Sequence, residues 1–383
     1  MPIDELTRNA VSVLPEGGLE AKLKLGRPLR VKFGIDVTSP DIHIGRGVPL
    51  QRMRAFQDEG HKGVLIVGDY TTRIGDPSGR STERPILSDE EIDANAQLYL
   101  EQAKVILRDD PELLEVRYNG EWLSQLSYAD VVRLGRIVTL ARMLERDDFE
   151  KRYRAGEPIS ISELLYPLMQ AYDSVAVEAD VELGGTDQLY NLLAGREVME
   201  AYGLEPQVVL TTPLLLSWDG EKMSSSVGNN VPLTAAPEEM FGRTMRIPDE
   251  QLAEWWSLVA EQQVPEGGPM QAKLDLARWI VARSHGEEAA AAAAEYFDST
   301  VRGKEVPDEV PEHPLPAGDP VHLPTVLAAA FDISTSEARR LIAQGGVKLD
   351  GEVVSELDLP RARLVGAVIQ AGKRRFVRLN EAT

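Results

Sequence analysis

The segment from Leu29 to Gly60 constrains the fold of this chain more than any other. Apolar residues occupy every second position from Leu29 to Val37, which is the spacing of a half-buried strand. Residues 38–41 interrupt this pattern, and Ser39 is the expected cap of a helix that holds Pro40 in its first turn. The apolar run at 64–67 then indicates a second, buried strand. Strand, helix and strand within about forty residues form a βαβ unit, which predicts a parallel sheet.

This unit also contains a candidate anion site. His43, Gly45 and Arg46 fall in the first turn or so of the helix, just beyond the end of the strand. Unpaired backbone N–H groups at such a terminus favour anions, and a glycine lets a ligand approach closely. A nucleotide phosphate is the expected ligand, and an ordinary turn between strand and helix is the equally weighted alternative.

Composition excludes several classes of protein. With 383 residues the chain is long enough for two or three domains, and no apolar run is long enough to cross a membrane. The N-terminus has no apolar signal core, so we expect a cytoplasmic protein with no membrane partner. There is no cysteine, and the five histidines show no metal-ligand spacing, so no tightly bound metal is expected.

Charge is distributed unevenly along the chain. The net charge is −21, yet residues 322–383 carry 9 Lys and Arg against 7 Asp and Glu. Prolines gather between 307 and 320, which predicts a linker and a domain boundary. Beyond it we expect a small α+β module that contacts an RNA backbone, with a solvated charged face as the alternative. Its candidate RNA-binding residues are Arg339, Arg340, Lys348, Lys373, Arg374 and Arg375.

Polar residues also gather in the first half of the chain. Asp76 lies in a tight Gly-rich turn at 75–79 that Arg80 and Arg84 follow. A carboxylate for an ammonium group with arginines for phosphate is one interpretation, and a solvated turn is the one that the residues alone favour. Tyr166, Gln170 and Asp173 share one face of a predicted helix, which fits either a pocket for a polar ligand or a satisfied buried network.

Two later segments repeat the arrangement of small and polar residues after a strand. Residues 184–188, Gly-Gly-Thr-Asp-Gln, follow an expected strand at 181–183. Lys222 is followed by serines and a glycine after an apolar run at 208–216. Such a loop is either plain surface or a mobile phosphate clamp, because lysine brings charge and the small residues allow closure.

Together these motifs resemble the bacterial tyrosyl-tRNA synthetases, which are class I aminoacyl-tRNA synthetases. The resemblance covers nearly the whole chain. It rests on His43-Ile44-Gly45-Arg46 as the HIGH-type motif, the loop at 75–79, the helix with Tyr166, residues 184–188 and the KMSKS-type loop at 222–226. The C-terminal residues resemble an S4 RNA-binding domain.

The resemblance implies an α/β architecture with a Rossmann-like parallel-sheet catalytic domain, followed by an α-helical domain and the small α+β S4 domain. We expect the catalytic domain at 1–232, the α-helical anticodon-stem-binding domain and linker at 233–318, and the S4-like domain at 319–383. It also implies ATP-dependent activation of L-tyrosine to tyrosyl-adenylate and transfer to tRNA(Tyr), with Mg²⁺ accompanying ATP and the chain acting as a homodimer.

By the same resemblance, Tyr166, Gln170 and Asp76 hold the tyrosine ammonium, Gln188 its carboxyl group and Asp173 its phenol. Lys32 stands where some family members place a phenol-binding tyrosine. The residues expected at ATP are Gly34, Asp36, His43, Gly45, Gly184, Gly185, Asp187 and Met223. Those expected to act on the reacting phosphates are Thr38, His43, Arg46, Arg80, Arg84, Lys222 and Ser225.

Three positions depart from the family pattern. Arg46 replaces the second histidine of HIGH, Ser225 the second lysine of KMSKS, and Val37 a proline. These departures motivate one alternative, a paralogue that activates a tyrosine analogue or serves antibiotic biosynthesis or resistance. A regulatory RNA-binding protein with an inactive catalytic domain is the other, and the retained Lys222 and Asp187 speak against it.

Overall fold

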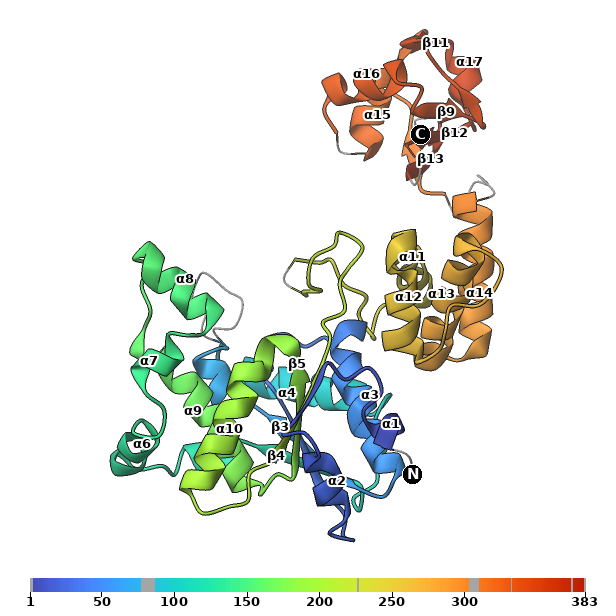
Figure 1. Cartoon of the computed structure of the whole chain (residues 1–383). Helices are drawn as coiled ribbons and strands as arrows, with labels where there is room; N and C mark the ends of the chain where they lie inside the picture. Colours follow the sequence, from blue (N-terminus) through green and yellow to red (C-terminus); the bar gives the residue numbers. More distant parts are fainter. Residues whose placement is uncertain are drawn as a thin grey trace. The chain divides into compact units, whose positions relative to one another are not determined.

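The computed structural model describes residues 3–76, 87–225, 227–302, 310–331, 333–372 and 375–381. These form two compact units, residues 1–284 and 285–383 (Figure 1). The three domains expected from the sequence stay a prediction. The compact units divide the chain at a different place, because helices up to residue 284 fall in the first unit together with the sheet.

A six-stranded sheet organises the first unit. Its strand order is β1-β6-β5-β2-β3-β4, in which β1 is antiparallel to β6 and the other neighbours are parallel. The predicted parallel sheet is therefore confirmed. The strands are β1 (Ser12–Leu14), β2 (Arg30–Ile35), β3 (Lys62–Val67), β4 (Leu114–Tyr118), β5 (Val181–Gly185) and β6 (Val208–Thr212). Because the chain builds β3 and β4 on one side of β2 and β5 and β6 on the other, the order reverses between β2 and β5, where ligands bind such sheets.

Helices cover both faces of this sheet (Figure 1). One core contains side chains of α3 and α4 against Val31, Phe33 and Leu65, while Val64 and Ile66 point to the opposite face. On that side α10 contacts β5 and β6, and α9 packs against α10. The longer helices are α3 (Ile44–Asp58), α4 (Asp89–Ala103), α8 (Asp147–Ala155), α9 (Ile161–Ala176), α10 (Leu189–Ala201), α11 (Pro237–Thr244) and α13 (Pro269–His285). The shorter ones are α1 (Ile3–Leu6), α2 (Gly18–Leu23), α5 (Gly120–Leu123), α6 (Tyr128–Leu134), α7 (Leu140–Met143) and α12 (Leu252–Trp255).

The start of α3 differs from the prediction. Ser39 does not cap this helix, which begins at Ile44 with His43 as its N-cap. The side chain of Gln102 explains the delay, since its Oε1 accepts from the Ile42 N–H at 2.7 Å and its Nε2 donates to the Pro40 carbonyl at 2.8 Å. These bonds hold residues 40–42 outside the helix, so that His43 is placed at its first turn.

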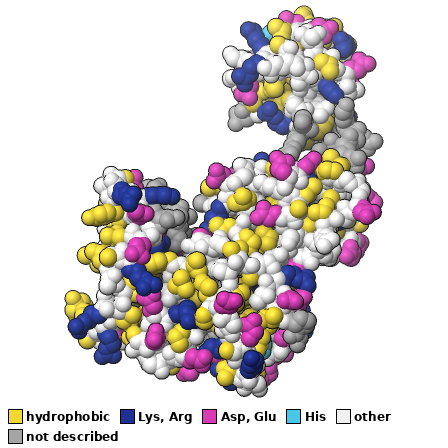
Figure 2. Space-filling view, viewed as in Figure 1, with side chains coloured by type: hydrophobic (Ala, Val, Ile, Leu, Met, Phe, Trp, Pro, Cys, Tyr) yellow, Lys and Arg dark blue, Asp and Glu magenta, His cyan; other side chains and the backbone are white. Residues whose placement is uncertain are grey.

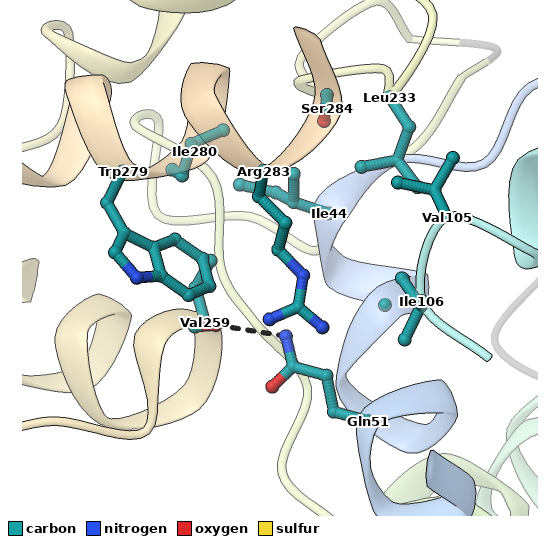
Figure 3. A pocket seen from close by; sticks show the side chains of 11 residues that line it. Ile44, Gln51, Val105, Ile106, Leu233, Val259, Trp279, Ile280, Arg283 and Ser284 are labelled. Carbon is teal, nitrogen blue, oxygen red and sulfur yellow. Dashed lines mark hydrogen bonds between the residues drawn. The ribbon is translucent and has the colours of Figure 1, made fainter. Parts of the chain in front are cut away.

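A narrow, mostly apolar pocket lies between α3 and α13 (Figure 3). Gln51 of α3 donates to the Val259 carbonyl at 2.9 Å, and Ile280 and Arg283 of α13 line the opposite wall. The bond from Gln51 thus ties the middle of α3 to residue 259.

The second unit contains α14 (Glu287–Phe297) and a small α+β module. Its five-stranded sheet has the order β10-β9-β12-β13-β7, and β11 pairs with β8. The elements are β7 (Glu312–Pro314), β8 (Val321–His322), α15 (Leu323–Phe331), α16 (Thr335–Ala343), β9 (Val347–Leu349), β10 (Glu352–Val353), β11 (Asp358–Leu359), α17 (Arg361–Leu364), β12 (Val368–Ala371) and β13 (Arg375–Asn380). Ser334 caps α16 by accepting from the Glu337 N–H.

The proline-rich segment corrects the prediction of a plain linker. Residues Glu312–Pro314 form β7, which pairs in parallel with β13, and Leu315 is buried in the core of the module. A proline is tolerated here because β7 is an edge strand and pairs on one side. The module therefore begins before residue 319.

Among the described residues, no helix is long and apolar enough to cross a membrane. Within the same residues, no group of three or more His, Cys, Asp or Glu side chains is arranged to hold a metal ion.

Candidate active site

The predicted site residues gather at the carboxyl edge of the parallel strands. Residues 36–43 follow β2, residues 68–76 follow β3, residues 186–188 follow β5, and the loop with Lys222 follows β6. Parallel strands end at a common edge, so four separate segments of the sequence converge on the point where the strand order reverses.

Asp36 joins the segments that follow β2 and β3 to helix α9. Its Oδ2 accepts from the Tyr166 hydroxyl at 3.0 Å, and its Oδ1 accepts from the Thr71 hydroxyl at 2.7 Å. A Cβ on Gly68 would lie 2.5 Å from Asp36 Oδ1, so only glycine fits at that position. The structure thus brings the candidates Asp36 and Tyr166 together and adds Thr71, which the sequence interpretation missed.

Asp173 is a buried carboxylate of α9. Its Oδ1 accepts from Trp122 Nε1 at 2.8 Å and its Oδ2 from Asn119 Nδ2 at 3.3 Å. Burial raises the pKa of Asp173 to about 7, although Lys32 and the two hydrogen bonds act in the opposite direction. Asn119 and Trp122 were not predicted, yet they follow β4 at the same edge of the sheet, and that position was the available signal.

Lys32 is close enough to Asp173 to affect its pKa, and it is fully buried on β2. Its Nζ is 2.8 Å from Glu182 Oε1, and it donates to the Ser174 hydroxyl at 2.7 Å and the Gln170 carbonyl at 2.9 Å. The strand pattern correctly placed Lys32 on the face opposite Val31, but that face is as buried as the other because α9 and α10 cover it. The contact between Lys32 and tyrosine stays a prediction.

Asp76 and Gln188 meet although 112 positions separate them. Gln188 Nε2 donates to Asp76 Oδ2 at 3.0 Å, and Gln188 Oε1 accepts from Asn191 Nδ2 at 2.9 Å. Asn191 in turn accepts from the buried guanidinium of Arg146 at 3.1 Å. The pair therefore presents a carboxylate and an amide side by side, with the amide fixed from behind.

Lys222 and Asp187 form an ion pair at the open side of the site. Their Nζ and Oδ2 atoms are 2.5 Å apart, and the Lys222 side chain is 57% exposed. A bridge between Leu216 and Lys222 ties the base of this loop. A Cβ on Gly185 would lie 2.6 Å from Asp187 Oδ1, which explains the glycine there.

His43 is a neutral imidazole at the start of α3. Burial, together with the positive charges of Arg46 and Lys222, lowers its pKa to about 3. Within the described part of the chain its Nδ1 has no hydrogen-bond partner. A Cβ on Gly45 would lie 3.1 Å from His43 Nδ1 and 3.3 Å from Met223 Sδ, so these three residues pack closely.

Other candidates take different positions. Gly184 meets α10, because a Cβ there would lie 2.9 Å from Leu192, whereas a Cβ on Gly34 would meet nothing within 4 Å. The Ser225 hydroxyl accepts from Asn230 Nδ2 at 3.1 Å, and Thr38 lies in the segment before α3. Arg80, Arg84, Lys373 and Arg374 lie outside the described residues.

The second unit presents several of its candidate arginines to solvent. Arg339 and Arg340 on α16 are exposed, as is Arg375 on β13, while Lys348 is half-buried. Arg339 Nη2 lies 3.3 Å from His322 Nε2, and His322 Nδ1 lies 2.7 Å from Asp358. Asp358 can only accept, so Nδ1 carries the proton and Nε2 accepts from Arg339, which fixes the arginine.

Comparison with known proteins places this geometry in a family. The family of class I tRNA synthetases (W and Y) matches residues 24–302, and the S4 domain matches residues 322–358. The tyrosine–tRNA ligase of Moorella thermoacetica is 47% identical over 393 aligned residues, which cover 98% of this chain and 94% of the relative. The chain belongs to the tyrosyl-tRNA synthetase family.

Other relatives agree with this assignment. The tyrosine–tRNA ligase of Thermotoga maritima is 46% identical over 98% of this synthetase and 96% of its own length. The crystal structure of the Archaeoglobus fulgidus tyrosyl-tRNA synthetase complexed with L-tyrosine shares the fold, with a TM-score of 0.61, 22% identity and coverage of 76% of this chain and 98% of that one.

These comparisons confirm the predicted family, fold class and class of enzyme. The synthetase is a ligase of the tyrosine–tRNA type with a C-terminal S4 domain. They give no support to the alternative of a paralogue specialised for a tyrosine analogue or for antibiotic biosynthesis or resistance.

Proposed function

We propose that this tyrosine–tRNA ligase activates L-tyrosine with ATP at the β2/β5 edge and transfers the tyrosyl group to tRNA(Tyr). A tyrosine carboxylate oxygen attacks the α-phosphorus, the bond to the β-phosphate oxygen breaks, and pyrophosphate leaves. The ribose hydroxyl of the tRNA 3′ end then attacks the carbonyl carbon of the adenylate and AMP leaves. The convergence of Asp36, Asp76, Asp173 and Gln188 beside Lys222 at one sheet edge is the observation that supports this proposal.

Tyrosine recognition uses the carboxylate side of the site. Tyr166, Gln170 and Asp76 receive the ammonium group, and Gln188, fixed by Asn191, faces the carboxyl group. Asp173 accepts the phenol hydrogen bond at the buried end of the pocket. Phenylalanine leaves this buried acceptor without its partner, which is a large penalty compared with the gain from apolar contact alone.

ATP binding uses the opposite side. Asp187 with Gly184 and Gly185 receives the ribose, while Gly34, Asp36, Gly45 and Met223 contact the nucleotide. Since Lys222 pairs with Asp187 in the structure, it has to exchange that carboxylate for the phosphates when the ribose arrives. The catalyst then needs positioning and charge stabilisation more than a general base, because the substrate carboxylate is itself the nucleophile.

The phosphates are bound by neutral and by positively charged donors. His43 acts as a neutral donor, because its lowered pKa keeps it uncharged at any working pH. Lys222 and Arg46 supply positive charge, Thr38 and Ser225 supply hydroxyl donors, and Arg80 and Arg84 complete the predicted set. Mg²⁺ enters as part of the nucleotide substrate.

The tRNA is bound through the exposed arginines of the second unit, and the enzyme acts as a homodimer in the cytoplasm. Large apolar side chains exposed on the successive helices α6 to α9 support the dimer, and Figure 2 shows apolar side chains, in yellow, over this part of the surface. They are Tyr128 on α6, Leu140 on α7, Tyr153 on α8 and Ile161 on α9.

Two assays test the proposal. Tyrosine-dependent exchange of pyrophosphate into ATP measures activation, and transfer of labelled tyrosine to tRNA(Tyr) measures charging. We expect both with tyrosine, and exchange with phenylalanine lower by several orders of magnitude. Absence of tyrosine-dependent exchange with folded protein would refute the first half, and exchange without charging would refute the second.

A further inference from the structure

All three N–H groups of the buried Lys32 are directed to protein acceptors. An ammonium group has three N–H donors. Lys32 directs them to Glu182 of β5, to the Ser174 hydroxyl and to the Gln170 carbonyl, at 2.8, 2.7 and 2.9 Å. A bond from Lys32 to a tyrosine phenol would require one of these three buried hydrogen bonds to be given up, which is costly.

Its partner is held as firmly. Lys32 and Glu182 are register partners across the junction of β2 and β5, so the sheet itself places them together. Glu182 also accepts from the Ser174 hydroxyl at 3.2 Å and from Gln207 Nε2. A Cβ on Gly195 would lie 2.6 Å from Gln207 Nε2 and 3.2 Å from Glu182 Oε2, so a glycine of α10 is required to close over the cluster.

The cluster supports the turn of α9 that carries the proposed tyrosine ligands. Gln170, Asp173 and Ser174 occupy one turn, and Lys32 binds both its first carbonyl and its last hydroxyl. Resting on the proposed function, we propose that Lys32 with Glu182 acts on tyrosine binding through charge: the lysine keeps the buried charge next to Asp173 balanced without touching the substrate.

The charges around Asp173 fit this role. The charged groups that act on it are Lys32 from β2 and Glu182 from β5, and its hydrogen-bond donors Asn119 and Trp122 are neutral. Lys32 lowers the pKa of Asp173 and Glu182 raises it. Removing the lysine alone therefore leaves two buried carboxylates without a cation, whereas removing both partners leaves the local net charge unchanged.

The experiment is a double-mutant cycle with Lys32→Met, Glu182→Met and the double variant, assayed by tyrosine-dependent exchange between pH 6 and 9. We expect Lys32→Met to raise the tyrosine KM by about tenfold or more and the double variant to return it to within about threefold of wild type. The ATP KM should change by less than about twofold in each. The pH at which the tyrosine KM changes should move up in Lys32→Met and down in Glu182→Met.

A direct contact gives a different result. If Lys32 bound the phenol, adding Glu182→Met would not restore the tyrosine KM, and that outcome overturns the proposal. A Lys32→Met variant with wild-type KM overturns it as well, while exchange by the wild type leaves the proposed function intact. Should Lys32→Met fail to fold, the double variant, which has no unpaired charge, still decides, because a tenfold rise in its tyrosine KM contradicts a role through charge balance and a near-wild-type KM excludes contact.

Lys22→Met is the matched control. Lys22 is also a buried lysine and lies 3.5 Å from Asp180 and 3.3 Å from Glu205, near the amino end of β5. Its loss should lower the midpoint of unfolding and leave the tyrosine KM unchanged. An equal rise in KM for this variant would show that any lost buried pair loosens the site, and would overturn a specific role for Lys32.

Discussion

Substituting Asp173 by Asn separates the electrostatic cost of this carboxylate from its shape. The pKa of Asp173 is raised from its ordinary value of 3.8 to about 7 because the group is buried. Between these two pH values the folded protein holds a proton that the unfolded chain has released. The contribution of Asp173 to the free energy of unfolding therefore falls as pH rises from 4 to 7 and is flat above and below that range.

The size of this effect follows from the shift. A difference of about 3 pKa units corresponds to roughly 4 kcal/mol of destabilisation above pH 7, at about 1.4 kcal/mol per unit. Roughly 3 kcal/mol of it develops between pH 5 and pH 8. Asn cannot titrate, so the free energy of unfolding of Asp173→Asn should rise by roughly 3 kcal/mol relative to wild type between pH 5 and pH 8. The substitution also disturbs the bond from Asn119, but that cost is independent of pH.

The assay is urea unfolding at pH 5, 6, 7 and 8, followed by tryptophan fluorescence. All five tryptophans lie in the first unit, so the signal reports the unit that contains Asp173. Asp180→Asn is the matched control: Asp180 is buried as well, but its pKa is lowered, chiefly by hydrogen bonding and charge from Arg27 against the effect of burial. Its contribution is lost only as pH falls below 3.8, so this variant should differ from wild type by a constant amount. Parallel pH dependences for wild type and Asp173→Asn would refute the raised pKa.

Three further predictions concern the phosphates and the tRNA. Lys222→Ala should lower kcat for adenylate formation by about a hundredfold and leave the tyrosine KM within about twofold of wild type, because the lysine acts on charge that develops in the transition state. Single-turnover kinetics measure this rate. A raised tyrosine KM with an intact kcat would contradict the prediction. Arg46→Ala should raise the ATP KM by about tenfold through loss of a cation beside His43, and an unchanged KM in exchange assays would exclude a phosphate contact. Deletion of residues 310–383 should abolish charging of tRNA(Tyr) and preserve exchange, whereas retained charging would refute the RNA role of the module.

The sequence predicted the catalytic fold well because its signals are local. The alternation at 29–37 and the apolar run at 64–67 appear as the parallel strands β2 and β3. The errors arose where a distant side chain decides the backbone. Gln102, about sixty positions away, delays the start of α3 to Ile44, and β13 turns part of the expected linker into β7.

The candidate site shows the same limit. Motif residues such as Asp76 and Gln188 were found from the sequence, but their contact depends on two loops meeting at the sheet edge. Trp122 has no motif of its own, and its bond to Asp173 appears only when β4 is placed beside β3. The hydrogen bonds of Lys32 could not be predicted from a strand pattern, because its three acceptors come from β5 and α9.

A separation of charge along the sheet edge reconciles an acidic chain with two anionic substrates. Asp76 and Asp173 lie on the side proposed for tyrosine, where we propose that they meet its ammonium group and its phenol. Lys222 and Arg46 lie on the side proposed for phosphate, close enough to His43 to lower its pKa. In the structure the Lys222 charge is neutralised by Asp187, and we propose that binding of the ribose to Asp187 frees the lysine for the phosphates. On this proposal one ion-pair exchange couples ribose recognition to phosphate activation, and a chain with a net charge of −21 presents a local positive charge to ATP when the ribose is bound.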